Sequence, residues 1–217
     1  MVNKETYKQL SNYCTEKKVT LVAVSKLKSA ADILEMYELG QRDFGENYVQ
    51  ELLEKQPQLP ADIRWHFIGH LQSNKVKYIA PFVHLIHGVD SVSLLKEIHK
   101  QGKKNNRTID CLLQLFIARE ESKFGMDETE LQAALELLPT LDHVQVKGLM
   151  GMASNTDDEK LVQQEFLQLK SVFDKNSKQT TNQQFETISM GMSGDYQLAV
   201  DSGSNMIRVG SLLFGRR

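Results

Sequence analysis

Short apolar runs recur along the chain, separated by more polar segments with helical spacing. Each run is short enough for a strand and is rich in β-branched or aromatic residues. In the first run the letters LVAV are unbroken by any polar residue, which is typical of a strand covered on both faces. The pattern predicts eight buried strands, within residues 19–26, 42–47, 65–70, 84–90, 109–118, 145–152, 185–193 and 205–210.

The segments between these runs carry helix signals. Ser29 is placed to cap a helix over residues 30–39, with Asp32 at its third position and Gly40 as its stop. Ser91 is placed to cap a second helix in the same way. We therefore expect helices to alternate with the strands.

Two later segments extend this alternation. Residues 127–138 form a good helix by intrinsic propensity. Thr156 and Glu159 have the spacing of a capping box before a helix with apolar residues on one face. We interpret the acidic residues of 156–160 as favourable charges at a helix start, and not as a catalytic carboxylate pair.

Strands that alternate with helices favour right-handed βαβ units in a parallel sheet. Eight units in 217 residues predict a lean (β/α)8 TIM barrel, with one domain over 1–217. An open doubly wound sheet is the alternative. That fold usually shows a glycine fingerprint after the first strand, and the letters SKLKSA at this position contain no glycine.

Composition narrows the classes of function. Hydrophobic residues make up 41 % of the chain, enough for one buried core, and a net charge of −2 gives no basic field for nucleic acid or anionic lipid. Cys14 and Cys111 are too few for a disulfide framework, which fits a cytoplasmic protein. Residues 1–10 lack the apolar segment of a secretion signal, and no run is long enough to span a membrane. No exposed apolar heptad calls for a partner helix, so we expect a monomer.

Polar residues follow the predicted strands at the end where barrel enzymes carry their sites. Ser25 and Lys26 end the first strand, Glu46 and Asn47 the second, and His70 the third. Lysine is almost never fully buried without a reason, although a strand end in water is the simpler interpretation of Lys26 taken alone.

Small residues follow the last two strands. Ser193 and Gly194 come after the seventh, and Gly210 and Ser211 after the eighth. The loops at these two positions often bind phosphate in a barrel, because small residues let backbone N–H groups come close to it. Ordinary turn chemistry is the alternative explanation.

A phosphate site near a lysine indicates a phosphorylated carbonyl compound as ligand. A neutral lysine amine attacks an aldehyde to form a Schiff base. The residues alone leave two ligands open, a sugar phosphate as in Schiff-base aldolases, or pyridoxal 5′-phosphate. Only the second would make the protein yellow.

Longer motifs show a family resemblance over about residues 20–215. The chain resembles the pyridoxal phosphate homeostasis protein family. This resemblance implies a fold-type III barrel similar to the N-terminal domain of alanine racemase, with pyridoxal phosphate as cofactor. The motifs are AVSK (23–26), FGENYVQE (44–51), WHFIGHLQSNK (65–75), ESKFG (121–125), KGLMGM (147–152), SMGMSGD (189–195) and IRVGSLLFG (207–215).

The resemblance also implies roles for single residues. Lys26 is similar to the lysine that forms the aldimine with the cofactor. Arg208 is similar to the residue that faces the pyridine nitrogen, and Asn47 to a residue near the ring. The implied phosphate ligands are Ser193, Gly210 and Ser211.

The chain departs from the family at two places. The family usually reads SKTKP after the first strand, where this chain has SKLKS at residues 25–29. The N-terminus is short, so we expect the family's leading helix to be clipped. Lys28 and Lys75 are the other amines near the predicted strand ends, and we expect both to be surface cations.

The histidines have a structural interpretation. His66 and His70 have the spacing of a zinc pair on a helix, but they lie in a predicted strand without further ligands, so we expect no metal site. His70 has a structural or cofactor-side role. We interpret His84 and His87 as structural residues on opposite faces of a strand, and Trp65 as core or lip packing.

The same resemblance raises the choice between an enzyme and a carrier. An arginine at the pyridine nitrogen weakens the cofactor as an electron sink. Alanine racemase also uses a tyrosine from a further domain, and this chain ends two residues after Gly215. We therefore expect a non-catalytic carrier that holds pyridoxal phosphate for vitamin B6 homeostasis, with pyridoxal-phosphate-dependent apoenzymes as partners. The alternative is a weak or undetected pyridoxal-phosphate-dependent enzyme, such as an amino-acid racemase, in which Tyr48 and His70 would be the first residues to examine for a second base.

Overall fold

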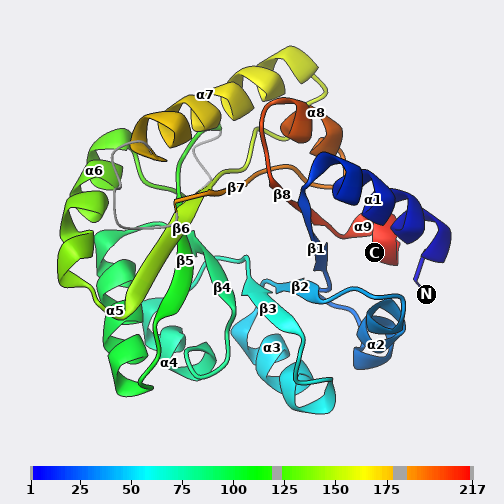
Figure 1. The fold of residues 1–217 in the computed structure, drawn as a ribbon, viewed down its shortest axis with the longest axis horizontal. Helices are drawn as coiled ribbons and strands as arrows, with labels where there is room; N and C mark the ends of the chain where they lie inside the picture. Colours follow the sequence, from blue (N-terminus) through cyan, green and yellow to red (C-terminus); the bar gives the residue numbers. More distant parts are fainter. Residues whose placement is uncertain (1, 119–123, 178–184, 216–217) are drawn as a thin grey trace.

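The computed structural model describes residues 2–118, 124–177 and 185–215. Within them, parallel strands pair in chain order from β1 to β8, and β8 pairs with β1 to close a barrel (Figure 1). The predicted (β/α)8 barrel is confirmed, and the open sheet is excluded. The first three residues of the motif at 121–125 lie outside the described residues.

The strands lie close to the predicted runs. The strands that begin at Arg64 and Val144 start one residue before their predicted runs, and the strand that begins at Thr187 starts two residues after the start of its run. The bounds are β1 Thr20–Val24, β2 Asp43–Glu46, β3 Arg64–Phe67, β4 Leu85–Val89, β5 Ile109–Gln114, β6 Val144–Met150, β7 Thr187–Ser189 and β8 Met206–Val209.

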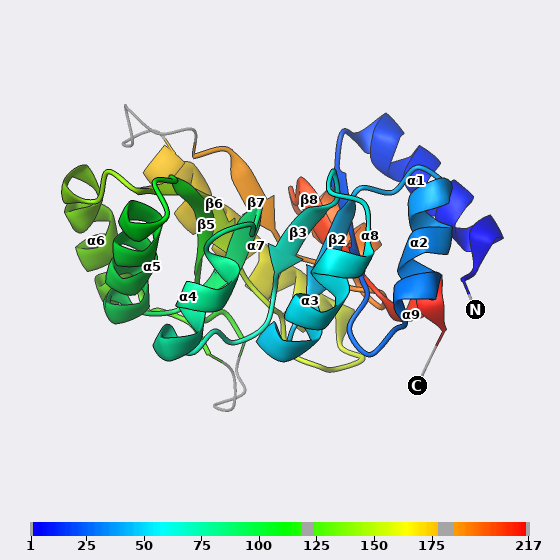
Figure 2. The same ribbon diagram turned by 90° about the horizontal axis from the view of Figure 1, so that it is seen from below.

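The helices form a ring outside the strands (Figures 1 and 2). The α-helices are α1 Lys4–Lys17, α2 Ala30–Glu38, α3 Val49–Lys55, α4 Val76–Ile79, α5 Val92–Lys104, α6 Glu128–Leu137, α7 Glu159–Ser177, α8 Tyr196–Asp201 and α9 Ser211–Phe214. Short 3-10 turns are η1 Gln56–Gln58, η2 Ser73–Lys75 and η3 Leu138–Thr140. No helix in the described parts of the chain is long and apolar enough to cross a membrane.

Two of the predicted caps are present. Ser29 and Asp32 form a reciprocal capping box at the start of α2, and the Leu94 N–H donates to Ser91 Oγ over 3.3 Å at the start of α5. Gly40 follows α2 with φ +106°, a left-handed conformation that glycine adopts without strain.

One other prediction about a helix is wrong. The capping box of Thr156 and Glu159 does not form, because α7 begins at Glu159 and the Leu161 N–H donates instead to Asp158 Oδ1 over 3.2 Å. The leading helix, which we expected to be clipped, is present as α1 and spans 14 residues. It packs against α9, and the Asn3 N–H donates to the Leu213 carbonyl over 2.8 Å.

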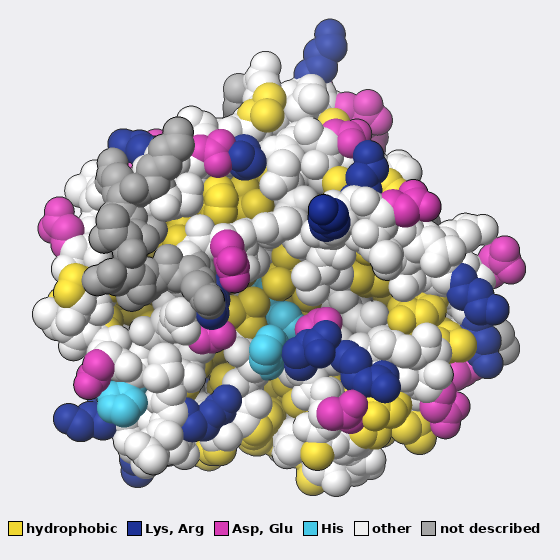
Figure 3. Space-filling view, viewed as in Figure 1, with side chains coloured by type: hydrophobic (Ala, Val, Ile, Leu, Met, Phe, Trp, Pro, Cys, Tyr) yellow, Lys and Arg dark blue, Asp and Glu magenta, His cyan; other side chains and the backbone are white. Residues whose placement is uncertain are grey.

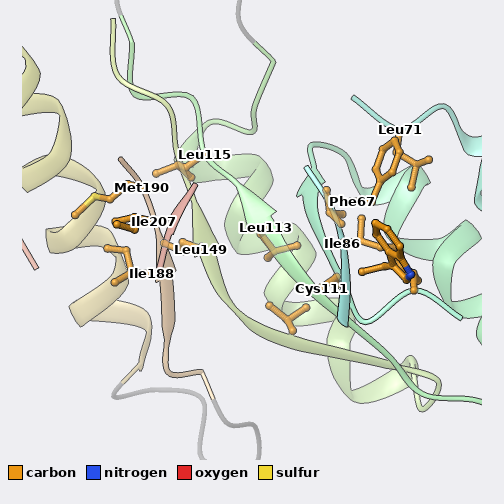
Figure 4. Packing of buried hydrophobic residues seen from close by; sticks show 14 of the residues in the cluster. Phe67, Leu71, Ile86, Cys111, Leu113, Leu115, Leu149, Ile188, Met190 and Ile207 are labelled. Carbon is orange, nitrogen blue, oxygen red and sulfur yellow. The ribbon is translucent and has the colours of Figure 1, made fainter. Parts of the chain in front are cut away.

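Strand residues alternate between the outer wall and the interior of the barrel. The outer residues pack under the helices and include Phe67, Ile86, Cys111, Leu113, Leu149, Ile188 and Ile207 (Figure 4). Trp65 joins this core, as predicted, with 3 % of its surface exposed. A second apolar cluster, of Val22, Leu85, Leu112, Met150 and Met206, has the opposite strand parity and fills part of the interior.

Candidate functional site

The first strand delivers Lys26 to the carboxyl end of the barrel. Val22 belongs to the interior cluster, and Lys26 lies four residues later, in the turn after β1 and on the same strand parity. Lys26 is half-buried, whereas its neighbour Ser25 is fully buried. The strand end that the sequence singled out is therefore neither core nor open surface.

A buried ion pair lies under this turn. Lys55 Nζ donates to Glu46 Oε1 over 2.8 Å and to the Ser25 carbonyl over 2.9 Å, and Ser25 Oγ donates to the same Glu46 oxygen over 2.6 Å. Desolvation raises the pKa of Glu46, although the hydrogen bonds from Lys55 and Ser25 oppose it. The sequence placed Glu46 at a strand end but gave no signal for Lys55, which comes from α3.

The same cluster holds the lysine loop in its unusual shape. Leu27 has φ +61°, a left-handed conformation that is costly for a leucine, and its N–H donates to the Glu51 carboxylate. Lys28 Nζ donates to the Phe214 carbonyl over 2.9 Å. The departure at residues 25–29 is thus accommodated, and Lys28 is engaged with the end of α9.

The two small-residue loops lie together. The Gly210 N–H donates to Ser193 Oγ over 3.2 Å, which joins the loop after β8 to the loop after β7. A Cβ on Gly210 would lie 3.2 Å from Val24, so this loop also packs against the end of β1. Gly194 follows Ser193 in the loop after β7, with open space beside it, and Ser211 begins α9 directly after Gly210. The predicted phosphate loops and the lysine strand therefore share one corner of the barrel.

Arg208 lies inside the barrel, with 4 % of its surface exposed. Its Nη1 donates to Ser189 Oγ over 2.7 Å and its Nη2 donates to the Gly151 carbonyl over 3.1 Å. Burial lowers the pKa of Arg208 to about 10, and the negative charge of Asp195 partly offsets this. Arg208 remains a hydrogen-bond donor at neutral pH.

Asn47 carries an unusual atom. Its Oδ1 is buried and has no hydrogen-bond partner among the residues that the structure describes. A buried polar atom without a partner is costly, and such atoms mark places where a ligand or water completes the structure. Asn47 thus has an acceptor to offer at the end of β2.

Beside Asn47 lies a groove of about 410 Å³, which includes Tyr48, His70 and Lys75 among its lining residues. His70 Nδ1 lies 2.9 Å from Asp90 Oδ2, and the ring stacks on Phe124 with centroids 4.0 Å apart. Lys75 is exposed, as predicted.

The expectation that His66 lacks further candidate ligands is wrong. Among the described residues, Asp43, His66 and His84 each place one ligand atom within 4.8 Å of the others, because β2, β3 and β4 are in register at this end of the barrel. Arg64 donates twice to Asp43, and its positive charge disfavours a cation there. Histidine, basic and acidic side chains gather near the middle of the face shown in Figure 3.

Comparisons with known proteins agree with one another. The family described as "Alanine racemase, N-terminal domain" matches residues 4–217. A curated relative from Pasteurella multocida, named "Pyridoxal phosphate homeostasis protein", is 37 % identical over 207 residues, covering 93 % of this chain and 88 % of the relative.

Two solved structures of PipY from Synechococcus elongatus are also similar. The structure without PLP has a TM-score of 0.93 at 37 % identity, covering 98 % of this chain and 99 % of that one. The structure with PLP bound has a TM-score of 0.87 at 36 % identity, covering 97 % and 100 %.

Proposed function

Because this chain belongs to the pyridoxal phosphate homeostasis proteins of the alanine racemase N-terminal domain family, we propose that it binds pyridoxal 5′-phosphate and takes part in intracellular vitamin B6 homeostasis. One observation carries the proposal. Gly210, whose N–H bonds Ser193, packs on the end of β1 just before Lys26, so an amine and a candidate phosphate loop lie at one corner of the barrel.

The residues at this corner fit the chemical groups of the cofactor. Lys26 offers the amine, and Ser193, Gly210 and Ser211 offer hydroxyl and N–H donors for a phosphate dianion. Arg208 offers N–H donors for the pyridine nitrogen. The partnerless Oδ1 of Asn47 would offer an acceptor for the ring hydroxyl.

Pyridoxal phosphate supplies an aldehyde that a lysine amine attacks with loss of water, and a ring that withdraws electrons from the former aldehyde carbon. In this chain Lys26 would provide the amine. The phosphate loops would orient the ligand and supply most of its affinity, because hydrogen bonds to a dianion are strong. Arg208, a donor with a pKa of about 10, would leave the pyridine nitrogen unprotonated and so weaken the electron withdrawal.

This arrangement supports a carrier in preference to an enzyme. Two-base proton transfer needs a second acid or base within hydrogen-bond reach of the reacting atom. Of the two residues considered for that role, His70 is engaged with Asp90 and Phe124, and Tyr48 is exposed. We infer that the chain holds and releases pyridoxal phosphate and turns over amino acids only in trace.

We propose that the protein acts as a cytoplasmic monomer that supplies pyridoxal-phosphate-dependent apoenzymes. Both cysteines are free and buried, which suits a reducing compartment. Light scattering of the purified protein checks the monomer, and transfer of cofactor to an added apoenzyme checks the partner.

The experiment for the proposed function is an absorbance spectrum of the purified protein with added pyridoxal phosphate, before and after borohydride. We expect a visible band that borohydride removes, and mass spectrometry should find a pyridoxyl group on the peptide that contains Lys26. A colourless protein with no labelled peptide would exclude pyridoxal phosphate and return the choice to a Schiff-base aldolase.

A further inference from the structure

A line of hydrogen-bonded polar side chains crosses the interior of the barrel. His66 Nε2 lies 2.9 Å from Asp43 Oδ1, and His66 Nδ1 lies 2.9 Å from His87 Nε2. His87 Nδ1 lies 3.1 Å from Ser189 Oγ, which accepts the 2.7 Å hydrogen bond from Arg208. The line thus runs from the amino-terminal rim, where Arg64 binds Asp43, to the arginine of the proposed cofactor site.

These side chains are buried among apolar ones. His87 and Ser189 are fully buried, and His66 is 1 % exposed. Neighbouring interior positions hold the apolar side chains of Leu85 and Met206. Apolar side chains in place of the histidines would fill the interior without the cost of desolvating polar groups. A buried polar network is stabilising only when every member has a partner, and here each ring nitrogen has one.

The chemistry of the groups fixes the direction of the hydrogen bonds. Arg64 and His66 hold the pKa of Asp43 below its usual range despite burial, so Asp43 is a carboxylate and only accepts. Burial keeps the pKa of His87 well below its usual value, so this ring is neutral and carries one N–H.

When the His66 ring holds a single proton, one arrangement satisfies every contact. His66 Nε2–H donates to Asp43, and His87 Nε2–H donates to His66 Nδ1. The Ser189 hydroxyl then donates to His87 Nδ1, which turns the oxygen lone pairs toward Arg208. Adding a proton to His66 would reverse the direction of the hydrogen bonds beyond it, because His66 would then donate to His87, and His87 would donate to Ser189.

We propose that His87 is a positioning residue for Arg208. By accepting the hydrogen bond from the Ser189 hydroxyl, His87 keeps Ser189 Oγ as a fixed acceptor for Arg208, and this acceptor orients the guanidinium toward the cofactor ring. Asp43 sets the direction of this line from the opposite rim, as a carboxylate sets the tautomer of a neighbouring histidine. The part that concerns the cofactor rests on the proposed function, whereas the proton arrangement stands without it.

The first test uses the full chain without cofactor. The nitrogen chemical shifts of the histidine rings distinguish an N–H at Nε2 from one at Nδ1. We expect His66 and His87 both to be protonated at Nε2 in the parent protein, and Asp43→Asn to give a mixture of tautomers. A His87 ring protonated at Nδ1 in the parent would overturn the proposal whether or not the protein binds pyridoxal phosphate.

The second test uses the protein loaded with pyridoxal phosphate. His87→Leu removes the acceptor, and we expect the absorbance maximum to shift and the dissociation constant to rise about fivefold to tenfold. His87→Asn keeps a carbonyl acceptor near the position of Nδ1, so it should restore most of both values. Met150→Leu, a change of shape at an interior residue outside the line, is the matched control.

If His87→Leu fails to fold, Ser189→Ala is the second variant, since it removes the acceptor of Arg208 directly and should give the same shift. An unchanged spectrum and affinity in the folded variants, with the parent still loaded, would overturn the positioning role. A parent protein that binds no cofactor would instead contradict the proposed function. The tautomers measured in the first test would then decide whether the proposed proton arrangement is correct.

Discussion

Lys55 Nζ lies 2.8 Å from Glu46 Oε1, and both side chains are shielded from water between the barrel wall and α3. The pair also binds the carbonyl and the hydroxyl of Ser25, the residue just before Lys26. The turn that presents Lys26 is therefore built on an ion pair that the rest of the core shields.

Lys55→Met should lower the free energy of unfolding by about 3–5 kcal/mol, because it leaves the Glu46 carboxylate buried without its cation. Urea unfolding measures this. The control is Lys4→Met, which breaks the exposed ion pair with Glu35 and should leave the stability nearly unchanged. Equal effects of the two substitutions would show that the buried pair contributes no more than a surface one.

Lys26→Ala should abolish the covalent label that borohydride traps, because it removes the attacking amine. Lys28→Ala and Lys75→Ala are the controls and should keep it, since Lys28 is engaged with the Phe214 carbonyl and Lys75 is exposed. Peptide mass spectrometry of the three variants checks the result. A label that persists in Lys26→Ala and disappears in either control would show that another lysine forms the covalent bond.

Ser193→Ala combined with Ser211→Ala should weaken binding of pyridoxal phosphate more than binding of unphosphorylated pyridoxal. Each lost hydrogen bond to the charged phosphate should cost on the order of 1.5–3 kcal/mol. Titration with both ligands measures the difference, with Ser177→Ala at the end of α7 as control. Equal losses for the two ligands would place the phosphate elsewhere.

The stability of the protein should fall as the pH drops below 6.5. The pKa of His87 lies well below 6.5 in the folded protein, so the unfolded chain takes up the proton first, which stabilises the unfolded state relative to the folded one. Unfolding curves between pH 7.5 and about 5 should therefore show a shallower pH dependence for His87→Asn than for the parent. The control Met150→Leu, a change at an interior residue without a titratable group, should keep the parent's slope.

Amino-acid racemisation and transamination should stay at trace level. A missing positioned acid or base typically slows a reaction 10²–10⁴-fold, or roughly 3–5 kcal/mol of barrier. The test incubates the loaded protein with a panel of L-amino acids and follows D-amino acids and keto acids, with Lys26→Ala alongside. Robust turnover that disappears in the variant would make this protein an enzyme, with Tyr48 and His70 the first residues to test as its second base.

Local sequence signals predicted the barrel and the caps at Ser29 and Ser91, because strands and caps depend on neighbours only a few residues away. The cap of α7 shows the limit of such signals. Thr156 and Asp158 both precede the helix and both suit a cap, and the choice between them depends on where the chain leaves β6. Only the folded chain decides that.

The wider connections of the site could not be read from the sequence. The contact of Glu46 with Lys55 depends on how α3 packs against β2, and the contact of His66 with His87 and Asp43 depends on strand register. The left-handed backbone conformation of Leu27 could not be predicted either, since leucine rarely takes it. Residues that act through long-range contacts have no local pattern.

The pairing of β1 with β8 has a consequence for the newborn chain. Thr20 pairs with Met206 and Ala23 with Val209, so the barrel closes through partners at opposite ends of the sequence. A ribosome delivers β1 first, and that strand must wait with one edge open until β8 has been made. The proposed site takes Lys26 from the first strand and Arg208 from the last, so a half-synthesised chain lacks part of the site, and the complete site forms only after β8 has left the ribosome.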